Sequence, residues 1–188
     1  KVLAGISGGA DSTCLLYVLS HLKEQMGFEL CVVHVNHGIR QEAQEDAVYV
    51  EKICKQLMIP FFLRTEDVPL IACREGLTEE EAGRSVRYAV FEELADKVGA
   101  TKIAVAHNRN DLAETMLLNL FRGTGLHGAG AIRPVRDRII RPLLDTERTE
   151  IEEYLRKKGI SYQTDQTNLE DEHTRSRIRH HILPYAQQ

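Results

Sequence analysis

The sequence predicts an α/β fold: an open, mostly parallel sheet of about five strands with helices on both faces, and a small C-terminal helical extension. Short apolar runs rich in β-branched residues alternate along the chain with segments whose apolar residues recur at helical spacing. Chains with this alternation form right-handed crossovers, which set neighbouring strands parallel. The length of 188 residues is that of one domain, or of one domain with a short tail.

Strands are expected where the apolar runs are short and nearly continuous. Residues 30–35 are the clearest case, because an almost unbroken apolar run is typical of a strand buried on both faces. The last strand is expected to be very short. The five expected strands are Val2–Ile6, Leu30–Val35, Pro60–Leu63, Ile103–Ala106 and Ile139–Ile140.

Helices are expected between these strands, where apolar residues recur every three or four positions. Gly99 is expected to end the third helix, since glycine is common just after a helix. Residues 66–77 are predicted to form a loop with a short turn of helix. The first three helices are predicted from Leu15, Val18, Leu19, Leu22 and Met26; from Ala43, Ala47, Val50, Cys54 and Leu57; and from Val86, Val90, Leu94 and Val98.

The fourth helix is predicted to bury an apolar face and to end at Gly123. A further helix is expected at Thr146–Lys158, residues 159–173 are predicted as a loop, and a basic helix is expected to begin at Thr174. The face of the fourth helix that is expected to be buried comprises Leu112, Met116, Leu117, Leu120 and Phe121.

The composition is that of a globular protein with enough apolar residues for a core, at 43% hydrophobic and 28% charged. We expect no transmembrane helix, because no run of about 18 apolar residues occurs, and no signal peptide at the start. A net charge of −4 argues against a domain that coats nucleic acid generally. Lys1 stands inside a strand-like run, so we expect native residues before it.

Four cysteines are widely spaced and form no CxxC pair, so neither a zinc ribbon nor a redox motif is expected. Cys14, Cys31 and Cys54 each fall in an apolar run, which predicts core thiols in a reducing cytoplasm. Arginines outnumber lysines by 16 to 8, and arginine is the better bidentate ligand for phosphate. A local basic face on an otherwise acidic protein is therefore plausible.

The motif SGGADS stands between the first strand and the first helix, and ligands of open α/β sheets bind at that end of the strands. Glycines let the backbone approach an anion, and the N–H groups of the following helix point at it. Asp11 would repel phosphate by itself, so it is predicted to be a magnesium ligand, directly or through water. The alternative is a plain glycine turn with helix caps. The predicted phosphate-binding residues are Ser7, Gly8, Gly9, Ala10, Asp11 and Ser12.

This motif resembles the pyrophosphate loop of the N-type ATP pyrophosphatases, which cut ATP to AMP and pyrophosphate and use the adenylate to activate a carbonyl oxygen. Further blocks resemble, within that superfamily, the catalytic domain of the tRNA(Ile)-lysidine synthetase family. These blocks are HVNHGIR (34–40), EEAGRSVRYAVF (80–91), AHNRNDLAETMLLNLFRGTG (106–125), IRPLL (140–144), DQTN (165–168) and TRSRIRHHILP (174–184).

The resemblance implies a Rossmann-like, adenine nucleotide alpha hydrolase-like fold. Residues 1–145 would be the ATP-binding catalytic domain, and residues 146–188 a helical extension towards further tRNA-binding domains. The implied reaction is ATP-dependent ligation of free L-lysine to C2 of the wobble cytidine of tRNA(Ile) with a CAU anticodon, through an adenylated cytidine. ATP, Mg²⁺, L-lysine and this tRNA are the implied cofactors and partners, in the cytoplasm and away from membranes. The oligomeric state stays open, with a homodimer as one expectation.

Asp111 and Glu114 lie three residues apart near the start of the fourth helix and so share a face. The resemblance implies that they handle lysine. A carboxylate pair can hold an ammonium and accept its proton, and only the neutral amine is a nucleophile. The alternative is two acids placed at the positive end of a helix. The catalytic residues implied overall are Asp11, Asp111, Glu114 and Arg87.

The end of the second strand carries His34, Asn36 and His37, which the resemblance implies flank the adenine of ATP. Two histidines without a suitably spaced third ligand do not predict a metal site. A turn at the end of the strand is the alternative for these residues.

Arginines supply the predicted phosphate contacts. Arg84 and Arg87 share a helix face, and an ion pair with Glu80 is the alternative for Arg84 alone. The resemblance implies an ATP or tRNA phosphate for Arg87. A solvated basic helix is the alternative for the arginines near the C-terminus. The residues predicted to contact tRNA or phosphate are Arg84, Arg122, Arg175, Arg177 and Arg179.

The chain departs from the family pattern HHxDDQxET at three positions. Asn108 replaces the second His, Asn110 the first Asp, and Leu112 the Gln. Weaker metal binding is expected if that Asp normally binds magnesium. Two alternatives to the ligase remain: a tRNA thiolase of the same fold, which would need reactive cysteines near the site, and a nucleotide-binding module without ligase activity.

Overall fold

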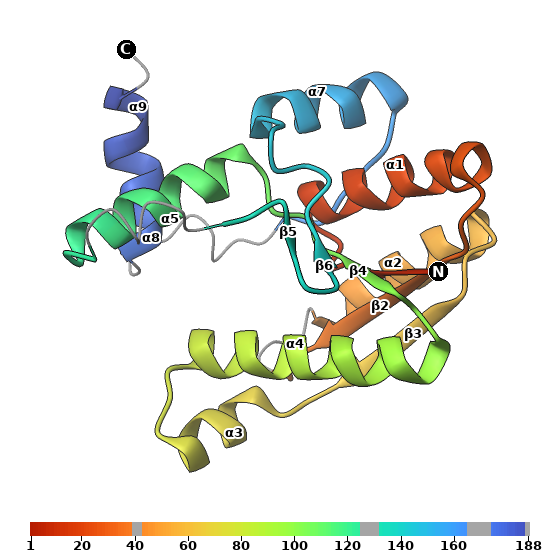
Figure 1. Cartoon of the computed structure of the whole chain (residues 1–188), viewed down its shortest axis with the longest axis horizontal. Coiled ribbons are helices and arrows are strands. Elements are labelled where there is room, and N and C mark those ends of the chain that lie inside the picture. The colour runs from red at the N-terminus through yellow and green to blue at the C-terminus, as the bar shows by residue number, and fades with distance from the viewer. Residues whose placement is uncertain (39–42, 125–131, 165–173, 187–188) are drawn as a thin grey trace.

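The structure is a computed structural model that describes residues 1–38, 43–124, 132–164 and 174–186 (Figure 1). Its centre is a six-stranded sheet with the order β3-β2-β1-β4-β6-β5. All neighbouring strands are parallel except β5 and β6, which pair antiparallel. The strands are β1 Val2–Gly5, β2 Leu30–Asn36, β3 Phe61–Thr65, β4 Lys102–Ala104, β5 Val135–Arg136 and β6 Ile139–Ile140.

The predicted α/β class is confirmed, and each of the five expected strands is present within a few residues of its predicted bounds. The prediction missed β5. Both residues of β5 are exposed, so this strand has no apolar pattern that a sequence could reveal.

Helices cover both faces of the sheet (Figure 1). On one face α1 (Ala10–Met26), α2 (Ala43–Gln56) and α7 (Arg148–Lys158) pack in one core cluster. On the other face α4 (Glu79–Val98) packs on β1, β2 and β4, and α3 (Val68–Glu75) packs on α4. The helix α3 replaces the loop with a short turn that was predicted there.

The strand β2 shows how the two cores are built from one sequence pattern. Val32 belongs to the core under α1 and α2, whereas Cys31 and Val33 belong to the core under α4. Successive side chains of a strand point to opposite faces, so a continuous apolar run fills both cores.

The helix α7 joins the first of these cores. Its Ile151 and Leu155 are fully buried there, and Tyr154 is partly buried against the same cluster. The helix predicted at Thr146–Lys158 is therefore confirmed. The division of the chain at residue 145 stays a prediction.

The predicted buried face of the fourth helix is wrong. This helix, α5 (Arg109–Phe121), extends away from the sheet instead of lying along it (Figure 1). All residues of α5 are described, and Glu114 is the one that is buried. Met116, Leu120 and Phe121 are 41%, 46% and 64% exposed. The apolar periodicity had no sheet face to cover, because α5 contacts the C-terminal helical segment instead.

That C-terminal segment consists of α8 (Thr174–Arg177), the π-helical turn η2 (Ile178–Ile182) and α9 (Leu183–Ala186). It fits the basic helix predicted from Thr174, and α8 and η2 contact α5 (Figure 1). Most of the predicted loop 159–173 and the DQTN block lie outside the described residues. Within the described part of the chain, no helix has the length and apolar character needed to cross a membrane.

Candidate active site

The strand order reverses between β1 and β4, which lie side by side at the centre of the sheet. The chain continues from β1 to one side, through β2 and β3, and from β4 to the other side, through β6. The helices α1 and α5 both begin just after these two strands. Ligands of open α/β sheets bind in the crevice at such a reversal point, so the predicted residues at both helix starts lie at the expected address.

The loop before α1 is shaped by the side chain of Ser12. Its hydroxyl accepts hydrogen bonds from the backbone N–H groups of Ser7, at 3.2 Å, and Gly8, at 3.0 Å. It also donates to the carbonyl of Gly9 at 3.0 Å. Gly8 has φ +101°, a conformation that favours glycine. Ser12 is thus an internal brace of the loop.

The first turn of α1 lies at this reversal point of the sheet. No side chain of the described residues caps it at Gly9, whereas Thr78 caps α4 and Asn108 caps α5. The free N–H groups at a helix start carry partial positive charge and bind anions. This start of α1 is therefore suited to a phosphate.

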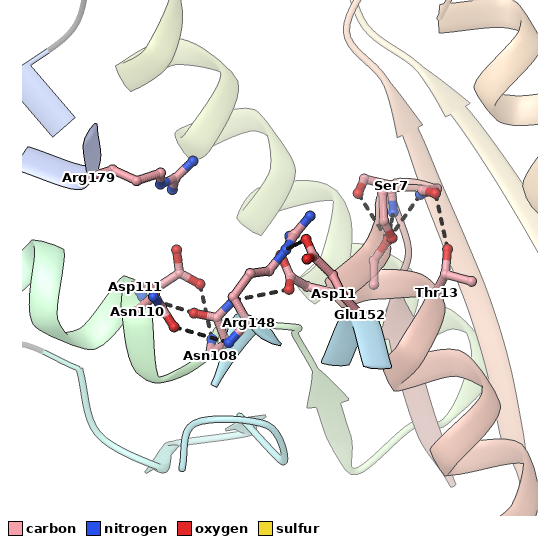
Figure 2. A network of polar contacts seen from close by, with 12 residues as sticks. Ser7, Asp11, Thr13, Asn108, Asn110, Asp111, Arg148, Glu152 and Arg179 are labelled. Atoms are coloured by element: carbon pink, nitrogen blue, oxygen red, sulfur yellow. Dashed lines mark hydrogen bonds and ion pairs between the residues drawn. The ribbon is translucent and has the colours of Figure 1, made fainter. Parts of the chain in front are cut away.

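Asp11 lies in the same first turn and connects α1 to two other helices (Figure 2). Its Oδ1 accepts a hydrogen bond from Asn108 Nδ2 at 3.0 Å, and its Oδ2 lies 2.5 Å from Arg148 Nη1. Burial raises the pKa of the Asp11 carboxyl, against the opposing effects of Arg148 and Asn108. Arg148 is a site residue that the sequence analysis missed.

Asp111 and Asn108 form a reciprocal cap at the start of α5. The side chain of Asn108 accepts from the N–H of Asp111, and the side chain of Asp111 accepts from the N–H of Asn108, both at 3.0 Å. Because Asn108 also contacts Asp11, the cap places Asp111 and the phosphate loop in one network (Figure 2). Asn108, which departs from the expected family pattern, therefore serves both as a helix cap and as a link across the site.

Glu114, one turn further along α5, is fully buried under Arg179 of η2. The guanidinium holds both carboxylate oxygens, with Nε 2.6 Å from Oε1 and Nη2 3.0 Å from Oε2. This hydrogen bonding raises the pKa of Arg179. The sequence analysis chose both residues but missed that they pair. π-Helical turns are frequent at functional sites, and this one carries Arg179.

Hydrogen bonds and an ion pair connect the start of α7 to the start of α5. The backbone N–H of Arg148 donates to Asn110 Oδ1 at 3.1 Å, and the N–H of Arg109 donates to the carbonyl of Thr146 at 3.0 Å. The side chain of Arg109 adds an ion pair with Glu147 at 2.8 Å. Three helix starts, those of α1, α5 and α7, thus meet around Asp11.

The predicted adenine-flanking residues take part in local structure at the end of β2. The ring Nδ1 of His34 lies 2.8 Å from the carbonyl of Ile6, so we place its proton there, and burial lowers the pKa of this ring. Asn36 accepts from the N–H of Gly38 at 2.9 Å. These contacts fit the alternative of a turn at the strand end, and the contact with adenine stays a prediction.

His37 and Arg87 contact each other, with Arg87 Nη2 donating to His37 Nε2 at 3.3 Å. Burial, and then the charge of Arg87, lower the pKa of His37 to about 4, so the ring is neutral at pH 7. Arg84 does not join them: its guanidinium lies over the ring of Tyr88, 5.2 Å from the centroid. Arg87 therefore remains a candidate for a phosphate contact.

Two of the other predicted arginines are exposed. Arg122 is exposed at the far end of α5, and Arg177 is exposed in α8. The side chain of Arg175 lies outside the described residues. The structure thus brings Asp11, Asp111 and Arg179 into one region (Figure 2), whereas Arg122 lies at the opposite end of α5 from Asp111.

The carboxylate oxygens of Asp11 are suited to bind a divalent cation that is shared with a nucleotide. The described residues contain no group of three or more His, Cys, Asp or Glu side chains that could hold a metal by themselves. Mg²⁺ is commonly held by one or two carboxylates together with substrate phosphates and water. Asp11 is a single partly exposed carboxylate beside a helix start that is suited to phosphate, and it meets that requirement.

The fold and this site define an ATP-using domain of the PP-loop class. The PP-loop domain family matches residues 1–186, so the chain belongs to this family. Curated relatives within this family carry a more specific name. The tRNA(Ile)-lysidine synthase of Caldanaerobacter subterraneus subsp. tengcongensis is 54% identical over all of this chain and 40% of its own length. That of Clostridioides difficile is 49% identical over 98% of this chain and 40% of its own length. The chain thus spans about two fifths of these relatives.

Solved structures show the same fold at low identity. The U34-tRNA thiolase NcsA from Methanococcus maripaludis, with its [4Fe-4S] cluster, has a TM-score of 0.68 and 20% identity over 93% of this chain and 67% of its own. The NMN synthetase from Francisella tularensis has a TM-score of 0.58 and 16% identity over 85% of this chain and 62% of its own. At these identities the likeness concerns the fold alone.

Proposed function

We propose that this domain catalyses the ATP-dependent ligation of L-lysine to C2 of the wobble cytidine of tRNA(Ile) with a CAU anticodon. The observation that carries the proposal is the link from the phosphate loop to the acids of α5, through the hydrogen bond between Asn108 and Asp11. The names of the relatives support the same reading.

The first step is adenylation. The C2 oxygen of the cytidine attacks the α-phosphorus of ATP, the bond from that phosphorus to pyrophosphate breaks, and pyrophosphate leaves. The first turn of α1, which has no side-chain cap at Gly9, holds the pyrophosphate through its N–H groups, and Ser12 stabilises the loop through its hydrogen bonds. Asp11 would hold Mg²⁺, which would neutralise negative charge on the phosphates.

The second step is lysine transfer. The neutral ε-amine of lysine attacks C2, the bond from C2 to the adenylate oxygen breaks, and AMP leaves. Asp111 holds the ammonium and takes the proton that the amine loses. Glu114 is engaged with Arg179, so its role is to hold that guanidinium beside the acid. A guanidinium has five N–H groups and Glu114 takes two, which leaves donors for the carboxylate of lysine.

The replacement Asp111→Ala tests this assignment. We expect the variant to keep ATP binding and to lose lysine-dependent AMP release by about 100-fold or more, as for removal of a general base. Binding is measured by calorimetry, and AMP is followed with lysine and a CAU-anticodon tRNA.

The matched control is Asp111→Asn, because asparagine keeps the acceptor of the α5 cap and lacks the charge. Both variants should lose transfer. Unchanged turnover in either would refute the role of Asp111, and ATP binding without AMP release in the wild type would favour a nucleotide-binding module.

The cysteines do not favour the alternative of a thiolase. Burial raises the pKa of Cys14 to about 11 and that of Cys54 to about 12, so neither forms a ready thiolate. Cys73 is exposed, but it lies on α3 rather than at the start of α1 or α5. Buried free thiols support a reducing cytoplasm, and a homodimer stays a prediction.

A further inference from the structure

Arg148 is the residue that joins Asp11, α5 and α7, and it lies at the centre of the network in Figure 2. We propose that Arg148 is a positioning residue that serves as the counter-ion of Asp11 in the nucleotide-free protein and yields this carboxylate to the divalent cation that arrives with ATP. Metal and arginine would then compete for one carboxylate. This inference rests on the metal-dependent ATP step of the proposed function and not on its lysine or tRNA steps.

The first argument is that both oxygens of Asp11 already have protein donors. Asn108 donates to Oδ1 and Arg148 to Oδ2. Asn108 is fixed by the reciprocal cap with Asp111, so its amide cannot turn away without opening the start of α5. A cation that binds Asp11 directly therefore competes with the guanidinium of Arg148 for Oδ2.

The second argument is that Arg148 can move without disturbing its helix. Its side chain is 39% exposed, and its backbone N–H is held separately by Asn110. Its Nε lies 2.7 Å from Glu152, one turn along α7, and this partner remains when the contact with Asp11 breaks. The contact with Asp11 is the one that can be exchanged.

The third argument concerns where the guanidinium goes. A guanidinium binds phosphate oxygens in bidentate fashion, and the phosphates of ATP would lie at the start of α1, beside Asp11. Arg148 released from Asp11 therefore moves onto the phosphates. The exchange keeps each charge paired, because the cation neutralises Asp11 while Arg148 neutralises phosphate.

The test measures Mn²⁺ binding, as a probe for Mg²⁺, by the relaxation of water protons in titrations of the protein without nucleotide. We expect Arg148→Gln to tighten Mn²⁺ binding about tenfold, the equivalent of one charge-assisted hydrogen bond. The same variant should weaken binding of a non-hydrolysable ATP analogue. A merely structural loss would weaken both.

The matched control is Arg109→Gln, which removes one positive charge from the neighbouring exposed pair with Glu147. It reports the long-range effect of charge alone. Arg148→Lys serves as a second variant that keeps the charge, and melting curves show that each variant is folded.

Tighter Mn²⁺ binding in Arg148→Gln than in Arg109→Gln, abolished by adding Asp11→Asn, supports the proposal. Equal Mn²⁺ affinity in the two glutamine variants overturns it and leaves the proposed function standing. If neither the wild type nor Arg148→Gln binds Mn²⁺, even with the ATP analogue, both the inference and the metal step of the proposed function fail.

Discussion

The helices α1 and α5 begin at the same point of the sheet and end in different surroundings. α1 lies along the sheet and buries Leu15, Leu16 and Leu19 in the core. α5 leaves the sheet, exposes Leu120, and buries Glu114 beneath an arginine of a segment much later in the chain.

This difference means that two kinds of force support the two halves of the site. The phosphate loop is held in place by α1, whose apolar side chains are buried in the core. Burial of apolar surface is strongly stabilising but non-directional. In α5, Asp111 is held by the helix cap with Asn108, and Glu114 by its buried ion pair with Arg179. A buried ion pair adds little net stability but is harmful to break. The position of α5 therefore depends on η2.

The largest expected effect on the free energy of unfolding comes from a substitution in the apolar core under α1. Leu16→Ala should lower the free energy of unfolding by about 3 kcal/mol, because it removes a fully buried side chain and leaves a cavity. The same change in α5, Leu120→Ala, should alter it by less than about 0.5 kcal/mol, since Leu120 is half exposed. Urea titration measures both. Equal losses would mean that the outer face of α5 is covered in solution.

A smaller effect is expected on the ionic side. Arg179→Met should destabilise by about 2 kcal/mol, because it removes the guanidinium that holds the buried Glu114 carboxylate. Adding Glu114→Gln to this variant should restore part of the loss, since the buried negative charge is then removed as well. Thermal melts of the two single variants and the double variant form the cycle. A strictly additive result would contradict the pairing.

The smallest expected effect concerns the loop that begins α1. Gly8→Ala should cost about 1 kcal/mol and weaken ATP binding, because alanine is strained at φ +101°. Gly9→Ala is the control, since its backbone is in the extended region and a Cβ there comes no closer than 3.8 Å to the surrounding atoms given for it. Denaturant unfolding and calorimetry with ATP compare them. If the two variants behave alike, the backbone geometry of Gly8 is unimportant.

Much of the fold could be predicted because it follows from local patterns. Continuous apolar runs marked the strands buried on both faces, and helical spacing marked α1, α2, α4 and α7. The same spacing failed for α5, because periodicity finds an apolar face without saying whether the fold covers it. The exposed two-residue strand β5 carried no such signal.

Site residues that belong to one contiguous motif could be predicted from the sequence. Contacts between residues far apart in the sequence could not. The phosphate loop is contiguous, so its residues were found together. Arg148 and Asp11 are 137 positions apart, and Arg179 and Glu114 are 65 apart. Pairings at such separations follow from topology and not from spacing. An arginine in a first helical turn with an acid four residues later, as at Arg148 and Glu152, was the one available hint.

The hairpin of β5 and β6 affects how readily copies of this domain associate through the edges of their sheets. A sheet edge offers unpaired backbone groups to any passing strand, and long flat edges promote intermolecular pairing. Here that edge is reduced to Val135 and Arg136, next to Pro134, so it offers another copy a short, charged template with a neighbour that cannot donate. The domain is thereby protected from aggregation along one side of its sheet.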